Sequence, residues 1–278
     1  MTLLRDPDAD GDSMRRALYD GNLLLLSGLA SVAALVQHAR DELSDLFAPH
    51  DPELAHEYFD RSTMAKILGA WKPAFIHSER STSLVRQIVA EAGFDPAQTH
   101  YDVPKPRTAF PVGHLTTGIA YAFPWHRDTW YCAPSQQLNW WLPIYPIRED
   151  NSMSFDLQSF GRHVPNSSAT FDYYLNNVYR LHTASQVTKE QQPRPAASDD
   201  HTADDYIVLP DPGEVLVFSG AHLHRTIPNT SGRARYSIDF RTVDVSDLLE
   251  GRGAPSVDAY CTGTAIRDFH NVADGSPF

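Results

Sequence analysis

The stretch PWHRDTWY, residues 124–131, contains a histidine and an aspartate separated by a single residue. If residues 125–130 are extended, His126 and Asp128 project from one face of a strand and Arg127 projects from the other. An imidazole and a carboxylate on one face can supply two ligands to a divalent metal. So short a motif is also common by chance, and taken alone it favours an ordinary hydrogen-bonded pair inside a core over a metal site.

A second stretch, FSGAHLHRTIPNTSGRARYSIDFRTV at 218–243, brings further imidazoles and several arginines to the end of an apolar strand. These residues are His222, His224, Arg233, Arg235 and Arg241. One of these histidines would complete a set of two imidazoles and one carboxylate. Such a set, with coordination positions left open, is typical of non-haem Fe(II) oxygenases.

The remaining chain has the composition of a globular protein, with 42% apolar and 11% aromatic residues among 278. Apolar spacing predicts helices over 29–47 and 81–94 and a short strand over 23–28. Strands bounded by Pro, Gly, Asn and Asp are expected at 114–123, 137–147, 152–157, 206–210, 214–220 and 234–243. We expect one domain, 1–278, with a helical part over about 1–107, a β core over about 108–245 and a tail over 246–278.

Charge and cysteine content narrow the class of protein. The net charge of −12 disfavours nucleic acid and anionic membranes as partners. Two cysteines cannot build a disulfide framework, so a reduced, cytoplasmic setting is expected. The most apolar run, 22–36, is too short and too interrupted to span a bilayer. Residues 185–205 are polar and without periodicity, which is typical of a mobile loop and equally compatible with a lid or a disordered insertion.

The order and spacing of the two motifs resemble the phytanoyl-CoA dioxygenase-like branch of the Fe(II)/2-oxoglutarate oxygenases. In that branch a distal histidine is followed by Pro-Asn and, eleven positions after the histidine, by an arginine. The residues that fit this pattern are His224, Pro228, Asn229 and Arg235. His222 does not fit, because the arginine eleven positions after it is Arg233 and the Pro-Asn pair then comes two places late. The resemblance covers most of 18–245.

The resemblance implies a mainly β protein with flanking helices, built on a double-stranded β-helix core of the jelly-roll or cupin type. It also implies iron held by His126, Asp128 and His224, with 2-oxoglutarate and O₂ as co-substrates. The residues expected around 2-oxoglutarate are Arg235, Thr226, Ser237, Trp141, Gln137 and Asn139. Arg235 would hold the distal carboxylate, because a guanidinium matches a carboxylate in forked geometry. Trp130 and Tyr131, which follow the first motif, are expected to line the substrate side.

The function implied is hydroxylation or oxidative cyclisation of a small polar metabolite. The acidic net charge suits an amino-bearing secondary metabolite such as an aminocyclitol or aminoglycoside. Two alternatives stay open: a metal-binding jelly-roll protein, and a zinc hydrolase that uses the same ligands. A nucleic-acid demethylase is disfavoured by 23 Lys and Arg against 35 Asp and Glu. Arg235 distinguishes the oxygenase from the metal-binding jelly-roll protein and the zinc hydrolase, because neither of these needs a buried cation at that position.

Overall fold

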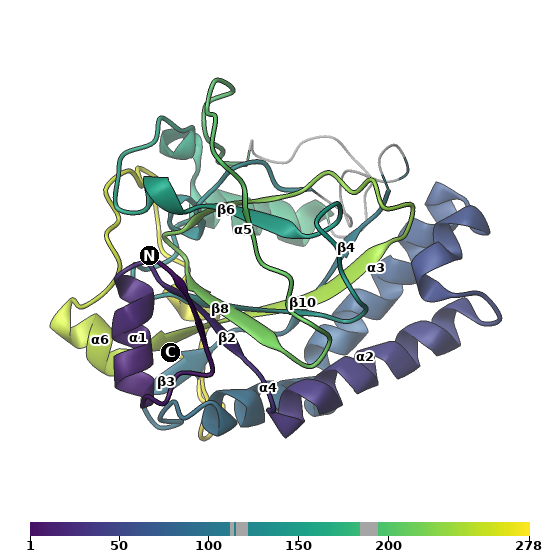
Figure 1. Ribbon diagram of the computed structural model, residues 1–278, viewed down its shortest axis with the longest axis horizontal. Helices are drawn as coiled ribbons and strands as arrows, with labels where there is room; N and C mark the ends of the chain where they lie inside the picture. Colours follow the sequence, from purple (N-terminus) through teal and green to yellow (C-terminus); the bar gives the residue numbers. More distant parts are fainter. Residues whose placement is uncertain (112–113, 115–121, 184–193) are drawn as a thin grey trace.

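The computed structural model describes residues 1–111, 114, 122–183 and 194–278, and its strands form two sheets (Figure 1). Within the described residues the large sheet has eight strands, in the order β1-β2-β8-β5-β10-β3-β11 with β4 paired to β10, and the small sheet has the order β7-β6-β9. The large sheet contains β1 (Leu3–Arg5), β2 (Leu23–Leu26), β3 (Thr99–Tyr101), β4 (Lys105–Ala109), β5 (Leu138–Pro143), β8 (Val215–Ser219), β10 (Arg235–Asp244) and β11 (His270–Asn271). The small sheet contains β6 (Met153–Asp156), β7 (Tyr206–Ile207) and β9 (Leu223–Thr226).

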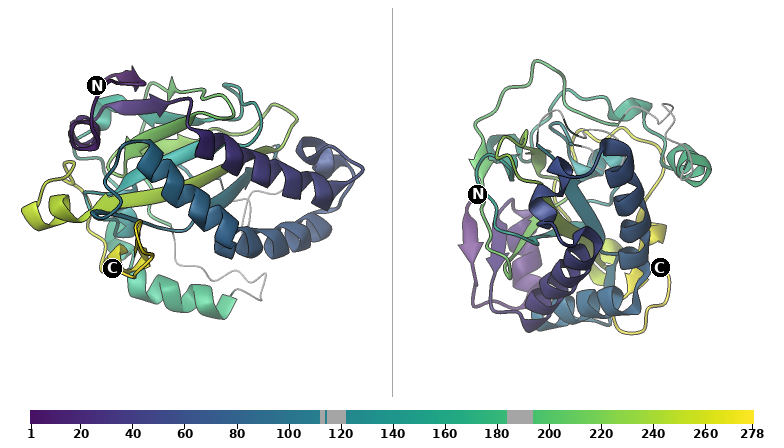
Figure 2. Two further views of the ribbon diagram at one scale, coloured as in Figure 1. Left: turned by 90° about the horizontal axis from the view of Figure 1, so that it is seen from below. Right: turned by 90° about the vertical axis from the view of Figure 1, so that its right-hand side faces the viewer.

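Helices cover the outer face of the large sheet (Figures 1 and 2). They are α1 (Gly11–Tyr19), α2 (Ala30–Phe47), α3 (Arg61–His77) and α4 (Glu79–Glu91), while α5 (Tyr173–Thr183) and α6 (Val245–Glu250) come later in the chain. Alternation along β10 turns Tyr236, Ile238 and Phe240 toward these helices, where they are fully buried with Trp140 of β5. This apolar layer is the main core of the protein.

The inner face of the large sheet is opposite the small sheet, and its apolar part forms a second core. Trp141 and Phe218 of the large sheet pack with Met153 and Phe155 of the small sheet. The inward residues of β10 are instead polar: Arg235, Ser237, Asp239 and Arg241. A polar stripe between two sheets needs partners or a ligand, because burying unpaired polar groups is costly.

Most of the expected elements are present. The structure confirms the helix over 29–47 as α2 and the helix over 81–94 as α4. It confirms the strand at 23–28 as β2 and the strands at 137–147, 152–157, 206–210, 214–220 and 234–243 as β5, β6, β7, β8 and β10. Residues 115–121 of the strand expected at 114–123 lie outside the described residues.

The part expected to be helical, about 1–107, contains α1 to α4 but is not helical alone. Four strands of the large sheet, β1 to β4, also begin within it. The prolines near residue 105 obscured β4, in which Pro106 is tolerated because the described part of this strand pairs only with β10. Helix α3 was not expected and contains an internal proline, Pro73. None of the helices among the described residues is both long and apolar enough to cross a bilayer.

Candidate metal centre

Main-chain hydrogen bonds join the two histidine motifs. His126 and His224 exchange two N–H···O=C bonds of 2.9 Å, so each strand end positions the other. The expectation that 125–130 is extended is wrong beyond Arg127, because a 3₁₀ turn begins at Asp128 and runs to Tyr131. The N–H of Asp128 donates to the carbonyl of Gly220 at 2.9 Å, which fixes the start of this turn.

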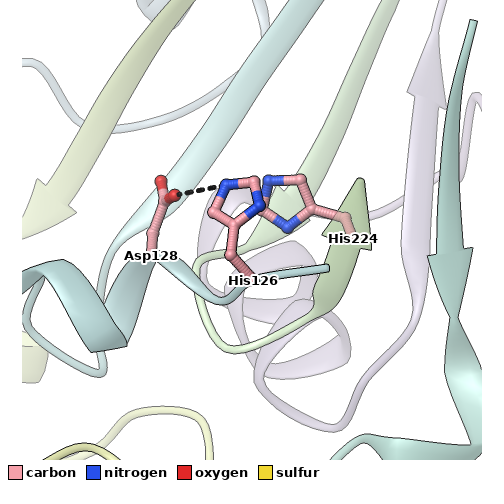
Figure 3. Close-up of side chains that lie close together, drawn as sticks. All are labelled: His126, Asp128 and His224. Atoms are coloured by element: carbon pink, nitrogen blue, oxygen red, sulfur yellow. Dashed lines mark ion pairs between the residues drawn. The ribbon is translucent and has the colours of Figure 1, made fainter. Parts of the chain in front are cut away.

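The three expected metal ligands converge, as Figure 3 shows. His126, Asp128 and His224 are all buried, and each offers one ligand atom within 4.8 Å of the others. The Nε2 atom of His126 lies 3.7 Å from Oδ1 of Asp128. The two imidazole rings are tilted at 47° with their centroids 4.2 Å apart. Two imidazoles and a carboxylate in this arrangement can bind one divalent cation on a single side, leaving other coordination positions open.

Backbone carbonyls set the orientation of both imidazoles. Nδ1 of His126 lies 2.8 Å from the carbonyl of Pro124, and Nδ1 of His224 lies 3.0 Å from the carbonyl of His222. A proton on each Nδ1 satisfies these contacts and leaves the Nε2 lone pair for a metal. Burial lowers the pKa of His126 to about 3 and lowers the pKa of His224 as well. Both imidazoles are therefore neutral, as metal ligands must be.

The carboxylate of Asp128 has one oxygen already engaged. Its Oδ2 accepts a 2.9 Å hydrogen bond from Nε2 of Gln137 and lies 3.4 Å from Nε of Arg241. The same Gln137 amide donates to Oδ1 of Asn139 at 2.9 Å. Burial alone would raise the pKa of Asp128, but Arg241 and the nearby histidines outweigh it, so the pKa lies below its ordinary value. Gln137 and Asn139 thus support the carboxylate in the structure, whereas contact with 2-oxoglutarate was expected of them.

Arg241 belongs to the site, although the sequence assigned it no role in binding a metal or a co-substrate. It contacts three carboxylates: Asp102 at 3.1 Å, Asp128 at 3.4 Å and Asp239 at 3.6 Å. Strand alternation contained the signal, because positions 235, 237, 239 and 241 share a face. Asp102 could not be placed from sequence, since it lies outside every motif.

Arg235 is buried in the polar stripe without an acidic partner among the described residues. Its side chain lies over the ring of Trp141 at 5.6 Å, and its Nε has no hydrogen-bond acceptor. The hydroxyl of Ser237, on the same face of β10, is also buried and unpaired. Burial lowers the pKa of Arg235 to about 10. A buried guanidinium beside an unpaired hydroxyl has the donors that a carboxylate ligand requires.

An aromatic wall flanks His126 on the outer side. The ring of Phe123 stacks on His126 at 4.9 Å, and Tyr131 approaches the same imidazole edge-on at 5.7 Å. Thr226, expected beside the 2-oxoglutarate carboxylate, accepts a hydrogen bond from the N–H of Phe123 at 3.2 Å. Its hydroxyl proton is still available to an acceptor. The phenol of Tyr131 donates to the carbonyl of Pro195 at 2.9 Å, which anchors the described end of the polar loop.

Trp130 does not line the substrate side as expected. It is fully buried, and its Nε1 donates to Asp258 at 2.9 Å. Asp258 also lies 3.4 Å from Nε of Arg127, and both side chains of this pair are almost inaccessible. The residue between the two metal ligands is thus held by the C-terminal segment, for which the sequence showed no pattern.

Known proteins resemble this chain in structure rather than in sequence. No family model matches the chain, and no curated protein is similar to it in sequence. A solved structure described as the apo form of ThoJ, a non-heme monooxygenase, is 14% identical over 82% of this chain and 76% of its own, with a TM-score of 0.46. EvdO2 from Micromonospora carbonacea var. aurantiaca, solved with 2-oxoglutarate, is 15% identical over 86% of this chain and 92% of its own, with a TM-score of 0.48.

Proposed function

We propose that this protein is a non-haem Fe(II)- and 2-oxoglutarate-dependent oxygenase built on a double-stranded β-helix core, in the phytanoyl-CoA dioxygenase-like branch. The observation that carries the proposal is the buried convergence of His126, Asp128 and His224. Their donor set fits Fe(II), because imidazole suits iron and a carboxylate offsets part of its charge. When bound, iron with 2-oxoglutarate supplies the activation of O₂ needed to oxidise a substrate C–H bond.

The unpaired groups on β10 support 2-oxoglutarate as the co-substrate. Arg235 and Ser237 offer buried donors that lack acceptors, on the inner face that also carries Arg241 beside Asp128. A dicarboxylate bound between the metal and Arg235 would satisfy both donors. Trp141 would wall this space, since its ring already lies beneath the Arg235 guanidinium. We assign Thr226 to the 2-oxoglutarate carboxylate at Arg235, to which its hydroxyl can donate a hydrogen bond.

The residues around the triad would keep one carboxylate oxygen available to the metal. Gln137 and Arg241 both approach Oδ2 of Asp128, so Oδ1 is the atom that faces the histidines. Single-oxygen coordination leaves more positions for the co-substrate and O₂. Phe123 and Tyr131 exclude water from the exposed side of His126, and Tyr131 is the residue we assign to substrate contact.

The substrate is proposed to be a small polar metabolite. The acidic surface does not extend to the inner side of β10, where four basic and three acidic side chains meet. These are Lys105, Arg107, Arg235 and Arg241 with Asp102, Asp128 and Asp239. Because basic and acidic side chains are nearly balanced here, the site gives no support to a substrate with a cationic group. The proposal of an amino-bearing substrate rests on the net charge of the whole chain alone.

Anaerobic titration of the Fe(II)-loaded protein with 2-oxoglutarate tests the proposal. Chelation of iron by the 2-oxo acid gives a weak visible charge-transfer band, which we expect in the wild type and not in Asp128→Ala. Succinate release on admitting O₂ would then be the readout for screening candidate substrates. Iron bound without the band would refute 2-oxoglutarate chemistry and favour the metal-binding protein or the zinc hydrolase.

A further inference from the structure

The two cysteines of the chain lie side by side next to the metal motif. Cys132 ends the 3₁₀ turn that Asp128 begins, and it belongs to a small apolar cluster against which Cys261 packs. Each sulfur also contacts a carbonyl beside the other cysteine: Cys132 Sγ lies 3.2 Å from Thr262 O, and Cys261 Sγ lies 3.3 Å from Thr129 O. The two sulfurs therefore face each other across two adjacent backbone segments.

The backbone on both sides of this thiol pair is held in place. The N–H of Ala265 donates to the carbonyl of Cys132 at 3.0 Å, and the N–H of Thr262 donates to Phe171 at 3.0 Å. The ring of Phe171 and that of Tyr173 pack around Cys132 in a small apolar cluster that includes Cys261. The two segments are therefore joined by main-chain hydrogen bonds, and both cysteines are held at the same small cluster.

The two thiols differ in accessibility and acidity. Cys132 is buried, with 5% of its surface exposed, whereas Cys261 is only partly buried. The neighbouring Cys132 thiol lowers the pKa of Cys261 to about 7, and the same proximity raises the pKa of Cys132. Since the thiolate is the reactive form, Cys261 is the sulfur that meets an oxidant first.

We propose that Cys132 and Cys261 form a redox modification site that a hydroperoxide converts into an intramolecular disulfide. The Cys261 thiolate attacks the peroxide oxygen, breaking the O–O bond; with a proton taken up, hydrogen peroxide gives a sulfenic acid and water. The Cys132 sulfur then attacks the Cys261 sulfur, and the sulfenic oxygen leaves as a second water. Together the two thiols lose two protons and two electrons, which reduce the peroxide to two waters. This proposal does not depend on the oxygenase function.

The disulfide would link two segments that already support the metal centre. The turn 128–131 supplies Asp128, and the C-terminal segment supplies Asp258, which binds Arg127 and Trp130. Oxidation would therefore tie the metal-binding turn covalently to the segment that braces it. We expect the oxidised protein to unfold at a higher temperature than the reduced protein, because the cross-link restricts the unfolded chain.

The test uses reduced, metal-free full-length protein in the presence of a chelator, so that iron cannot drive other oxidations. Stoichiometric hydrogen peroxide should lower the titre of free thiols from two per chain to zero, since the sequence has two cysteines. The intact mass should fall by two hydrogen atoms, peptide mapping should join residues 132 and 261, and dithiothreitol should restore both thiols. Added oxygen atoms, covalent dimers or persistent thiols would overturn the proposal.

Single variants test the order of the two steps. Cys132→Ser should accumulate a sulfenic acid on Cys261 that dimedone traps, because the resolving thiol is gone. Cys261→Ser should react with peroxide much more slowly, because the remaining thiol is buried. Equal peroxide rates in the two variants would refute the assignment of Cys261 as the first nucleophile. Should either variant fail to fold, wild-type peptide mapping still decides whether the bond forms.

Discussion

Replacing Arg235 with methionine should stabilise the ligand-free protein and weaken 2-oxoglutarate binding at the same time. The guanidinium is buried, and its Nε has no acceptor. Burial lowers its pKa from the ordinary arginine value to about 10. At about 1.4 kcal/mol per pKa unit, the charged side chain is roughly 3 kcal/mol less favourable in the folded protein than in the unfolded chain.

Arg235→Met removes this cost and keeps a long, flexible side chain in the space. It also loses the cation–π contact with Trp141, which is worth about 1 kcal/mol. The free energy of unfolding should therefore rise by about 2 kcal/mol. For a chain of this size that corresponds to a melting temperature roughly 4–8 °C higher. A buried arginine that destabilises the ligand-free protein in this way is explained by an anionic ligand that binds to it.

On the proposed function, the same substitution also removes a charged hydrogen bond to 2-oxoglutarate, worth about 1.5–3 kcal/mol. The dissociation constant for 2-oxoglutarate should then increase by about 10- to 150-fold. Differential scanning calorimetry measures the first effect, and anaerobic titration of the charge-transfer band measures the second.

Arg233→Met is the matched control. Arg233 is partly exposed and pairs with Asp51 at 2.6 Å and Glu53 at 2.9 Å. Its loss should lower stability by less than about 1 kcal/mol and leave 2-oxoglutarate binding unchanged. Our reasoning would be refuted by an Arg235→Met protein that is less stable than the wild type without ligand. Equal binding losses in the two variants would refute the assignment of Arg235.

Three other outcomes are expected. His224→Ala should abolish stoichiometric metal binding measured by calorimetry, whereas His222→Ala should retain it, because the two ring nitrogens of His222 lie against the carbonyls of Ser219 and Gly21 instead; the reverse would move the metal site. Asp258→Asn should cost about 3–5 kcal/mol in urea unfolding, because it leaves a buried guanidinium unpaired, while Glu250→Gln, in an exposed pair, should cost under about 1 kcal/mol; similar losses would contradict this. Arg241→Gln should raise the pKa of the Asp128 carboxylate. On acidification, metal affinity should therefore begin to fall at a higher pH in the variant than in the wild type. Identical pH profiles of metal affinity would exclude an electrostatic role for Arg241.

Two short patterns, together with the family resemblance, selected three residues that the structure brings together. The single residue between His126 and Asp128, and the arginine eleven places after His224, are patterns that a sequence states directly. Trp140 and Trp141 are adjacent on β5, and they lie in separate cores, as period-2 alternation requires. These predictions succeeded because they depend on distances of a few residues along one element.

The supporting contacts could not be predicted, because they join distant parts of the chain. Asp258 reaches Trp130 from 128 positions away, and Asp102 reaches Arg241 from 139 positions away. The turn at Asp128 depends on a carbonyl at Gly220, where any side chain would press on Gln137 and Asp128. Neither carboxylate belongs to a periodic pattern, so nothing local distinguishes it from a surface residue.

The bracing of Arg127 by Asp258 has a consequence for how the protein is made. Synthesis proceeds from the N-terminus, so the first metal motif leaves the ribosome long before the aspartate that neutralises its buried arginine. During that interval the guanidinium cannot be buried without an uncompensated charge, and the ligands on either side of it are not yet fixed. On the proposed function, metal loading should therefore be a late event in biogenesis, following synthesis of the C-terminal segment. Nascent chains stalled before residue 258 should not retain metal.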